Sequence, residues 1–178
     1  MKKLKTIEIE RLDTDAFRAV RKVPITVVLD SVRSMNNVGA VFRTADAFRI
    51  DQVMLCGITA CPPHPDIHKT ALGAEESMTW CYRASAEEAV TELKSAGVRV
   101  YALEQATDSI SLETFQVDTS LQYALVLGNE VKGVRQSVID LCDGCIEIPQ
   151  YGTKHSLNVS VAAGITMWHL SHPFFEDL

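Results

Sequence analysis

The sequence has no long hydrophobic run. No stretch of it reaches the roughly 18 apolar residues that a membrane-spanning helix needs. The basic start at residues 1–5 is followed by acidic residues, instead of the apolar core of a secretory signal peptide. The chain also shows no internal repeat and no interdomain linker. With 178 residues, 47% of them hydrophobic, we therefore expect one compact cytoplasmic domain.

Cysteine is scarce, and its spacing suits neither disulfides nor metals. The five cysteines are an odd number, and three of them stand alone: Cys56, Cys61 and Cys81. Cys142 and Cys145 have the spacing of redox and zinc sites, but a second Cys or His pair at zinc spacing is missing. Cys61 would need His64 and His68 as co-ligands, and this cluster has no evident fourth ligand. We predict reduced thiols and no metal site.

The sequence also lacks the glycine patterns of nucleotide-binding proteins, and it is short of positive charge. It has neither a Gly-x-Gly dinucleotide fingerprint nor a Gly-Lys-Ser/Thr phosphate loop. The formal net charge of −6 argues against a nucleic-acid binder. Residues 1–22, however, hold seven Lys/Arg against four Asp/Glu. We treat them as a short N-terminal extension to a domain at residues 23–178, either as a basic arm or as a solvated helix around Arg11–Lys22.

Apolar runs typical of strands recur along the chain. They are Ile25–Leu29, Gln52–Leu55, Met78–Tyr82, Val98–Leu103, Ala124–Leu127 and Cys145–Ile148. Helical patterns lie between several of these runs. The alternation predicts an α/β fold with a mostly parallel sheet flanked by helices.

Three helices are well marked. The first follows the first strand, with Asn37 as its cap and an apolar face at helical spacing. The second begins with a capping box at Ser85 and ends at Gly97. The third, at about 158–170, is apolar nearly all round, which is typical of a helix buried in the core or in a dimer interface. His172-Pro173 should end it.

Residues 57–76 are the least regular part of the sequence. Three prolines interrupt them: Pro62, Pro63 and Pro65. We interpret the segment as a loop, and contact with a substrate is one function that it would serve.

One candidate site segment is Asn37-x-Gly39-x-x-x-Arg43. It places Arg43 about one and a half turns into a helix whose start faces the carboxyl ends of the sheet, where ligands of open parallel sheets bind. An ordinary structural interpretation is also open, in which Asn37 only caps the helix and Gly39 permits close packing. Arg43 would then pair with Asp46 on the surface.

Two further segments follow later strands. In the first, Gly128 lets a ligand approach the backbone, and Glu130 lies at the end of a buried strand. In the second, Ser156 and Asn158 precede the long apolar helix. The ordinary alternatives are a turn with a solvated carboxylate in the first segment and simple helix capping in the second.

These three segments resemble the three sequence motifs of the SpoU (TrmH-like) family, whose members are RNA ribose methyltransferases of the SPOUT class. They occur in the same order and share many of the same residues. The run Ile148–Gly164 resembles the third motif of that family, and the resemblance covers most of the chain. It implies transfer of a methyl group from S-adenosylmethionine to a ribose 2′-hydroxyl of RNA. It also implies a C-terminal trefoil knot, which no periodicity predicts.

The resemblance assigns roles to individual residues. Those implied to activate or position the substrate are Arg43, Asn37, Glu130, Ser156 and Asn158. Those implied to contact the cofactor through the backbone are Leu103, Gly128, Ile148 and Leu157. Candidates for contacts with RNA phosphates are Arg33, Lys154 and His155, although solvated loop residues would look the same.

The reaction is a displacement at the sulfonium methyl group, so the protein must place the ribose oxygen in line and help to remove its proton. In the family, the arginine that matches Arg43 is the proposed activator. A guanidinium keeps its proton in nearly all proteins. We therefore interpret Arg43 as a phosphate clamp and a stabiliser of the developing alkoxide, and we leave the proton acceptor open.

Many family members that modify ribosomal RNA carry a separate N-terminal RNA-binding domain, whereas only about two dozen residues precede the first strand here. Compact members often act on tRNA, so we expect a tRNA substrate, with rRNA as the alternative. The resemblance also implies a homodimer, and the all-round apolar last helix gives that state an independent reason. Two other functions stay open: a non-catalytic RNA-binding or ribosome-assembly module, and a base methyltransferase.

Overall fold

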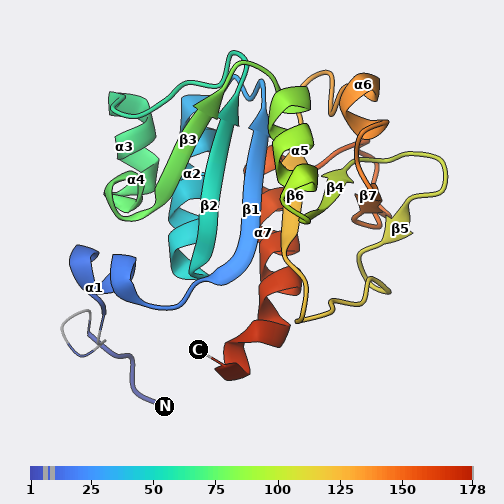
Figure 1. Cartoon of the computed structure of the whole chain (residues 1–178). Helices are drawn as coiled ribbons and strands as arrows, with labels where there is room; N and C mark the ends of the chain where they lie inside the picture. The colour runs from blue at the N-terminus through green and yellow to red at the C-terminus, as the bar shows by residue number, and fades with distance from the viewer. Residues whose placement is uncertain (6–7, 9–10, 178) are drawn as a thin grey trace.

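A seven-stranded sheet in the order β3-β2-β1-β6-β4-β7-β5 forms the centre of the molecule (Figure 1). The computed structural model describes residues 1–5, 8 and 11–177. Its strands are β1 (Val23–Asp30), β2 (Ile50–Cys56), β3 (Thr79–Arg83), β4 (Arg99–Leu103), β5 (Ile110–Ser111), β6 (Tyr123–Leu127) and β7 (Gly144–Glu147). All neighbouring strands are parallel. The α/β fold with a parallel sheet is thus confirmed, and so are the six predicted strands.

Helices cover both faces of this sheet (Figure 1). They are α1 (Thr14–Ala19), α2 (Met35–Ala47), α3 (Pro65–Ala71), α4 (Ala74–Ser77), α5 (Ala86–Ser95), α6 (Gln136–Ile139), α7 (Val159–Ser171) and the 3₁₀ helix η2 (His172–Asp177). The capping box of α5 is confirmed, because Ser85 Oγ accepts from the backbone N–H of Glu88 at 3.2 Å. Gly97 follows that helix with a φ of 83°.

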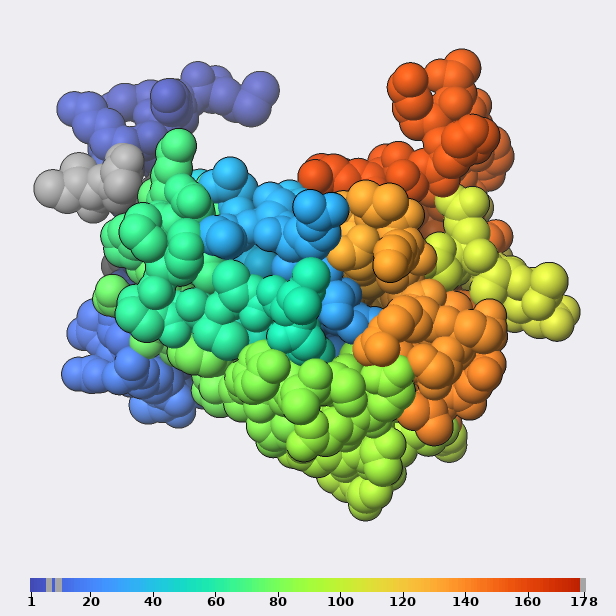
Figure 2. Space-filling view, turned by 90° about the horizontal axis from the view of Figure 1, so that it is seen from above, coloured from blue at the N-terminus to red at the C-terminus, as the bar shows by residue number. Residues whose placement is uncertain are grey.

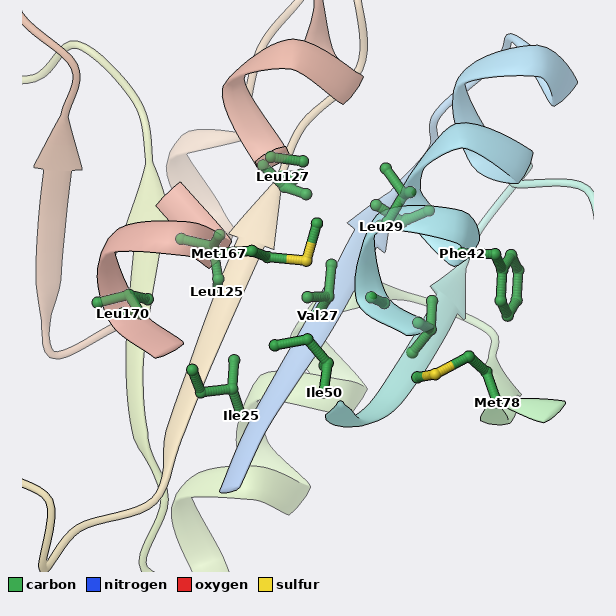
Figure 3. Close-up of a cluster of buried hydrophobic side chains, with 14 of the residues drawn as sticks. Ile25, Val27, Leu29, Phe42, Ile50, Met78, Leu125, Leu127, Met167 and Leu170 are labelled. Carbon is green, nitrogen blue, oxygen red and sulfur yellow. The ribbon is translucent and has the colours of Figure 1, made fainter. Parts of the chain in front are cut away.

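Alternating side chains of the central strands feed two separate cores. Val27 and Leu29 of β1 pack with α2 and α7, whereas Val28 packs on the opposite face with α5. Figure 3 shows the first core, in which Met167 and Leu170 of α7 point toward the side chains of β1 and β6. Parallel strands buried on both faces read as continuous apolar runs, which is why the sequence pattern marks them so clearly.

The start of α2 differs from the prediction. Ser34 is its N-cap, and Ser34 Oγ accepts from the backbone N–H of Asn37 at 3.3 Å. The prediction that Asn37 caps the helix was wrong. The Asn37 side chain is therefore free to make a contact outside the helix, which is described with the site below.

The expected irregular loop at residues 57–76 is also corrected. Its second half forms α3 and α4, and α3 begins at Pro65 after His64, whose Nδ1 accepts from the backbone N–H of Asp66 at 3.2 Å. Proline at the first position of a helix costs no hydrogen bond there. The prolines therefore end the irregular stretch and start a helix that packs against α2.

Gly39 is the contact point between α2 and α3. A Cβ atom at this position would lie less than 3.0 Å from Thr70 Oγ1 and from the backbone carbonyl oxygen of Ile67. Gly39 therefore permits close packing, as one of the two interpretations of this motif expects.

Replacing Gly39 with alanine should lower the free energy of unfolding by about 1–3 kcal/mol, because the extra methyl group overpacks a helix contact made partly by backbone. Urea unfolding measures the change. Gly164→Ala in α7 is the matched control, because a Cβ there meets only Thr44 Cγ2 at 3.8 Å. This control should stabilise the protein or leave it unchanged, within about 1 kcal/mol. Equal effects of the two substitutions would contradict the packing argument.

The last helix is only partly as expected. It begins after Asn158 and passes into η2 at His172, close to the predicted bounds. Ala163, Met167 and Leu170 are buried, but Val161, Ile165 and Trp168 are 51%, 42% and 51% exposed. The prediction that α7 is buried on both sides in the core of one chain was therefore wrong. The alternative, that its exposed side is buried in a dimer interface, stays a prediction.

Residues 11–22 of the N-terminal extension contain the short helix α1. α1 covers only the middle of the predicted Arg11–Lys22 helix, and Arg18 Nη2 donates to the carbonyl oxygen of Glu76 in α4 at 2.6 Å. Residues 6, 7, 9 and 10 of the predicted arm, and residue 178 of the predicted domain, lie outside the described residues. Division into an extension and a domain at residues 22 and 23 stays a prediction, as does the trefoil knot.

Of the helices in the described part of the chain, none has the length and apolar character that crossing a bilayer requires.

Candidate functional site

A cavity of about 1110 Å³ lies at the carboxyl ends of β4, β6 and β7. Figure 2 looks onto this edge of the molecule, where the segments that follow β1, β6 and β7 come together. All four residues predicted to contact a cofactor line the cavity: Leu103, Gly128, Ile148 and Leu157. Each of them comes from a segment at or after a strand end, which is where parallel sheets bind ligands.

The turn after β6 forms one wall of the cavity. Asn129 and Gly133 exchange two backbone hydrogen bonds, of 3.1 and 2.9 Å, and Asn129 Oδ1 accepts from the backbone N–H groups of Val131 and Lys132. A Cβ atom on Gly128 would lie less than 3.0 Å from the backbone of Gly133 and Val134. Gly128 is therefore required for the turn to fold back on itself.

Glu130, in this turn, is held by the segment that follows β1. Its carboxylate accepts from the backbone N–H groups of Arg33 and Ser34, both at 2.9 Å, and from Asn37 Nδ2 at 3.0 Å. Asn158 Nδ2 donates in turn to Asn37 Oδ1 at 3.2 Å. Side chains from all three sequence motifs thus form one continuous hydrogen-bonded network, which we call the Glu130 network.

The hydrogen bonds also set the charge of this network. Burial raises the pKa of Glu130, but the backbone groups of Arg33 and Ser34 and the amide of Asn37 together lower it more, so the pKa lies below its usual range. Glu130 is therefore a stable anion, and the alternative of a merely solvated turn carboxylate does not describe it.

Glu130→Gln should be less stable than the wild type at about pH 7, and the difference should shrink as the pH falls below about 4.5. A carboxyl with a depressed folded-state pKa stabilises the folded protein above its unfolded pKa and loses that effect as it becomes protonated. Urea unfolding at a series of pH values measures the difference. A difference that stays constant down to about pH 3 would show that the charge of Glu130 contributes nothing.

The two polar residues of the third motif, Ser156 and Asn158, have different contacts at the start of α7. Asn158 caps the helix, since its Oδ1 accepts from the backbone N–H groups of Ser160 and Val161 at 2.9 and 3.4 Å. It serves both as a cap and as part of the Glu130 network. Ser156 lines the cavity and is exposed, and it makes no hydrogen bond to the described residues. Simple capping is therefore wrong for Ser156.

Two arginines, a lysine and a histidine that were predicted to lie near the site are exposed. They are Arg33, Arg43, Lys154 and His155. Among the described residues, Arg43 forms no ion pair with Asp46, which accepts from Ser77 Oγ at 2.6 Å. The alternative in which these two residues pair on the surface was therefore wrong. His155 lines the cavity, and Gln105 Nε2 donates to its carbonyl oxygen at 3.0 Å. Arg33, Arg43 and Lys154 lie outside the cavity lining.

Two acidic residues at strand ends were missed by the sequence analysis. Glu104, directly after β4, lines the cavity and accepts from the backbone N–H of Val134 at 2.9 Å. Asp30, the last residue of β1, is 1% exposed and accepts from Arg135 at 3.2 Å. The signal that would have found them is their position, because each carboxylate lies at the carboxyl end of a parallel strand.

His68 and Cys142 make contacts outside the cavity lining. His68 Nδ1 lies 2.6 Å from Glu75 Oε1, and its pKa is raised by that hydrogen bond. Cys142 Sγ donates to the carbonyl oxygen of Val138 at 3.2 Å, and burial raises its pKa to about 12. A thiol with so high a pKa is a poor nucleophile and a poor metal ligand.

The sequence is similar to those of RNA methyltransferases. Residues 24–168 match the profile of the SpoU rRNA Methylase family. The chain is 28% identical over 153 residues to the 23S rRNA (guanosine-2′-O-)-methyltransferase RlmB of Neisseria meningitidis serogroup B, across 86% of this chain and 60% of that protein. It is 30% identical over 167 residues to the RlmB of Coxiella burnetii, across 92% and 66%. The chain thus spans less than two thirds of the length of these curated relatives.

The fold is similar to those of solved members of the same group. The TrmH/SpoU tRNA modifying enzyme of A. aeolicus superposes with a TM-score of 0.80 and 26% identity, across 92% of this chain and 83% of that one. An AdoMet-bound rRNA methyltransferase from Sinorhizobium meliloti superposes with a TM-score of 0.79 and 27% identity, across 89% and 60%.

Proposed function

Because the chain belongs to the SpoU rRNA Methylase family, we propose that it transfers a methyl group from S-adenosylmethionine to a ribose 2′-hydroxyl of RNA. The observation that carries this proposal is the Glu130 network, which joins all three motifs beside a cavity at the carboxyl edge of the sheet. The proposal includes a cytoplasmic location, where such an RNA substrate is found.

The cavity suits this cofactor in size and charge. Its volume of about 1110 Å³ lies slightly above the usual range for small-molecule sites, about 300–1,000 Å³, so the cofactor has room to enter. Four carboxylates line it: Glu104, Asp108, Glu130 and Glu147. The lining contains one lysine, Lys132, so the excess of negative charge favours a ligand that carries a sulfonium and an ammonium group. Leu103, Gly128, Ile148 and Leu157 would hold the adenosine part through their backbone groups.

S-Adenosylmethionine, when bound, supplies an activated methyl group, and the protein contributes placement and charge. The protein's own task would be to hold the ribose hydroxyl in line with that methyl group and to favour the loss of its proton. Arg43 would stabilise the negative charge that develops on this oxygen and hold a neighbouring phosphate. Asn37, Glu130, Ser156 and Asn158 would orient the ribose, since three of these four already hold one another in place.

The proposed substrate is tRNA, with rRNA as the alternative. The likeness to the tRNA modifying enzyme of A. aeolicus, of which the chain covers 83%, supports tRNA. The likeness to the RlmB proteins supports rRNA, and there the coverage is 60–66%. Arg33, Lys154 and His155 are exposed at or near the cavity and would contact phosphates of either RNA.

The enzyme is proposed to work as a homodimer that buries the exposed face of α7. Val161, Ile165 and Trp168 lie at helical spacing on this face, and each is at least 42% exposed. Trp168 also packs against Phe48 and Phe175, with ring centroids 5.5 and 5.6 Å apart. An exposed apolar stripe anchored by packed aromatic rings is typical of a protein interface.

Trp168→Glu should convert the dimer to a monomer. Loss of a central aromatic contact commonly costs about 2 kcal/mol or more, so the dimer dissociation constant should rise about 30-fold or more. Light scattering across a dilution series measures it. Leu72→Glu is the matched control, because Leu72 is 64% exposed and lies outside α7. If both variants dimerise like the wild type, α7 is not the interface.

The proposed activity is tested with purified protein, labelled S-adenosylmethionine and unmodified total RNA. The RNA is fractionated after incubation and digested to nucleosides. Label in a 2′-O-methyl nucleoside supports the proposal, and the labelled fraction distinguishes tRNA from rRNA. Label on a base would identify a base methyltransferase. Measurable cofactor binding without transfer to any fraction would favour the non-catalytic module.

A further inference from the structure

Glu104 occupies a position in the site that no motif describes. It is the first residue after β4 and is half-buried in the cavity wall. Its Oε2 accepts from the backbone N–H of Val134 at 2.9 Å, and its Oε1 accepts from the backbone N–H of Gln105 at 3.0 Å. Oε2 therefore joins the end of β4 to the segment after β6, and Oε1 is held by the backbone of the next residue.

The segment that Glu104 holds is the turn that carries Glu130. Val134 lies directly after Gly133, whose backbone pairs with Asn129 across the turn. Glu130 lies between these two residues and is held by Arg33 and Ser34. Glu104 thus fixes the base of the turn on the cavity side, and the Glu130 carboxylate fixes its tip on the side of α2.

Gly133 makes the approach of the carboxylate possible. Its φ is 65°, a conformation that favours glycine, and a Cβ atom there would lie less than 3.0 Å from Glu104 Oε2. A larger residue would have to push the carboxylate away from Val134. The glycine and the carboxylate therefore act as a pair.

We propose that Glu104 is a positioning residue for the methyl transfer, acting through the turn to keep Glu130 in its network and the cavity wall in place. This inference rests on the proposed function. Both oxygens of the carboxylate accept from backbone N–H groups, so we attribute its effect on the rate to the geometry of the turn. Displacing a catalytic group by about 1 Å commonly costs on the order of 100-fold in rate.

Glu104→Ala should therefore lower kcat about 10- to 100-fold, while the KM for RNA changes much less. Glu104→Gln should recover most of kcat, because its side-chain oxygen can still accept from Val134. Glu113→Ala, which removes an exposed carboxylate, is the control and should behave like the wild type. Wild-type kcat in Glu104→Ala, or an equal loss in the alanine and glutamine variants, would overturn the proposal.

Hydrogen exchange provides a readout that does not depend on activity. The Val134 amide should exchange about tenfold or more faster in Glu104→Ala than in the wild type, and close to the wild-type rate in Glu104→Gln. If the wild type transfers no methyl group to any RNA, the proposed function fails, whereas the exchange rates still decide whether Glu104 holds the turn. If the Val134 amide exchanges at the wild-type rate in Glu104→Ala, the inference about Glu104 is wrong, whereas the proposed function is unaffected.

A double-mutant cycle tests the pairing with Gly133. Gly133→Ala should speed exchange of the Val134 amide in the wild-type background, because the new methyl group displaces the carboxylate. The same substitution should have a smaller effect in the Glu104→Ala background, where only the backbone strain is left. Purely additive effects would contradict the pairing.

Discussion

Arg43→Ala should reduce kcat for methyl transfer about 100- to 1000-fold and leave the affinity for S-adenosylmethionine nearly unchanged. The expected loss is that of a single charged group that stabilises a developing oxyanion. The cofactor should still bind because Arg43 lies outside the lining of the cavity. The side chain is exposed and makes no ion pair within the described residues, so its removal should not affect folding.

Single-turnover rates and calorimetric titration of the cofactor measure the two effects of Arg43→Ala separately. Arg43→Lys is the matched control, since it keeps the charge but loses the planar fork that binds a phosphate with two hydrogen bonds. Its rate should lie between those of the wild type and the alanine variant. If all three proteins transfer methyl groups at the same rate, Arg43 has no part in the reaction.

Gly128→Val should weaken binding of S-adenosylmethionine by about 100-fold or more, a cost of about 3 kcal/mol. The new Cβ would lie less than 3.0 Å from the backbone of Gly133 and Val134. Backbone atoms cannot rotate away as a side chain can, so the turn must move and the cavity wall with it. Because Glu130 lies in the same turn, kcat should fall as well.

Calorimetric titration with the cofactor tests this prediction, and thermal unfolding shows whether the variant remains folded. Gly152→Val is the control, because a Cβ on Gly152 meets nothing within 4 Å in the loop before α7. It should bind the cofactor like the wild type. Wild-type affinity in a folded Gly128→Val protein would show that the turn does not form the binding wall.

The sheet was predictable because its strands are buried on both faces. The strands β1, β2 and β6 are recognisable in the sequence as apolar runs. The glycines and carboxylates that follow them indicate the functional edge of the sheet. The two residues of β5 are too few to form a pattern. The helical segments α3 and α4 were missed because prolines were taken as interruptions, although Pro65 begins α3.

The contacts within the site were less predictable because they depend on strand order. Asn37 was assigned to the helix cap, but Ser34 takes that role, and Asn37 bonds to a carboxylate 93 residues away. Only the pairing of β1 with β6 places these side chains together. The partner of Glu104 was unpredictable for the same reason, since Val134 follows 30 residues later.

The long sequence separations in the Glu130 network have a consequence for synthesis of the protein. Glu130 bonds to residues 93–97 positions before it, and Asn158 bonds to Asn37 across 121 positions. A growing chain can form β1 and β2 early, but the network has to wait until Asn158 has left the ribosome. No shorter nascent chain contains the complete site, so an unfinished copy of the protein should be unable to modify RNA.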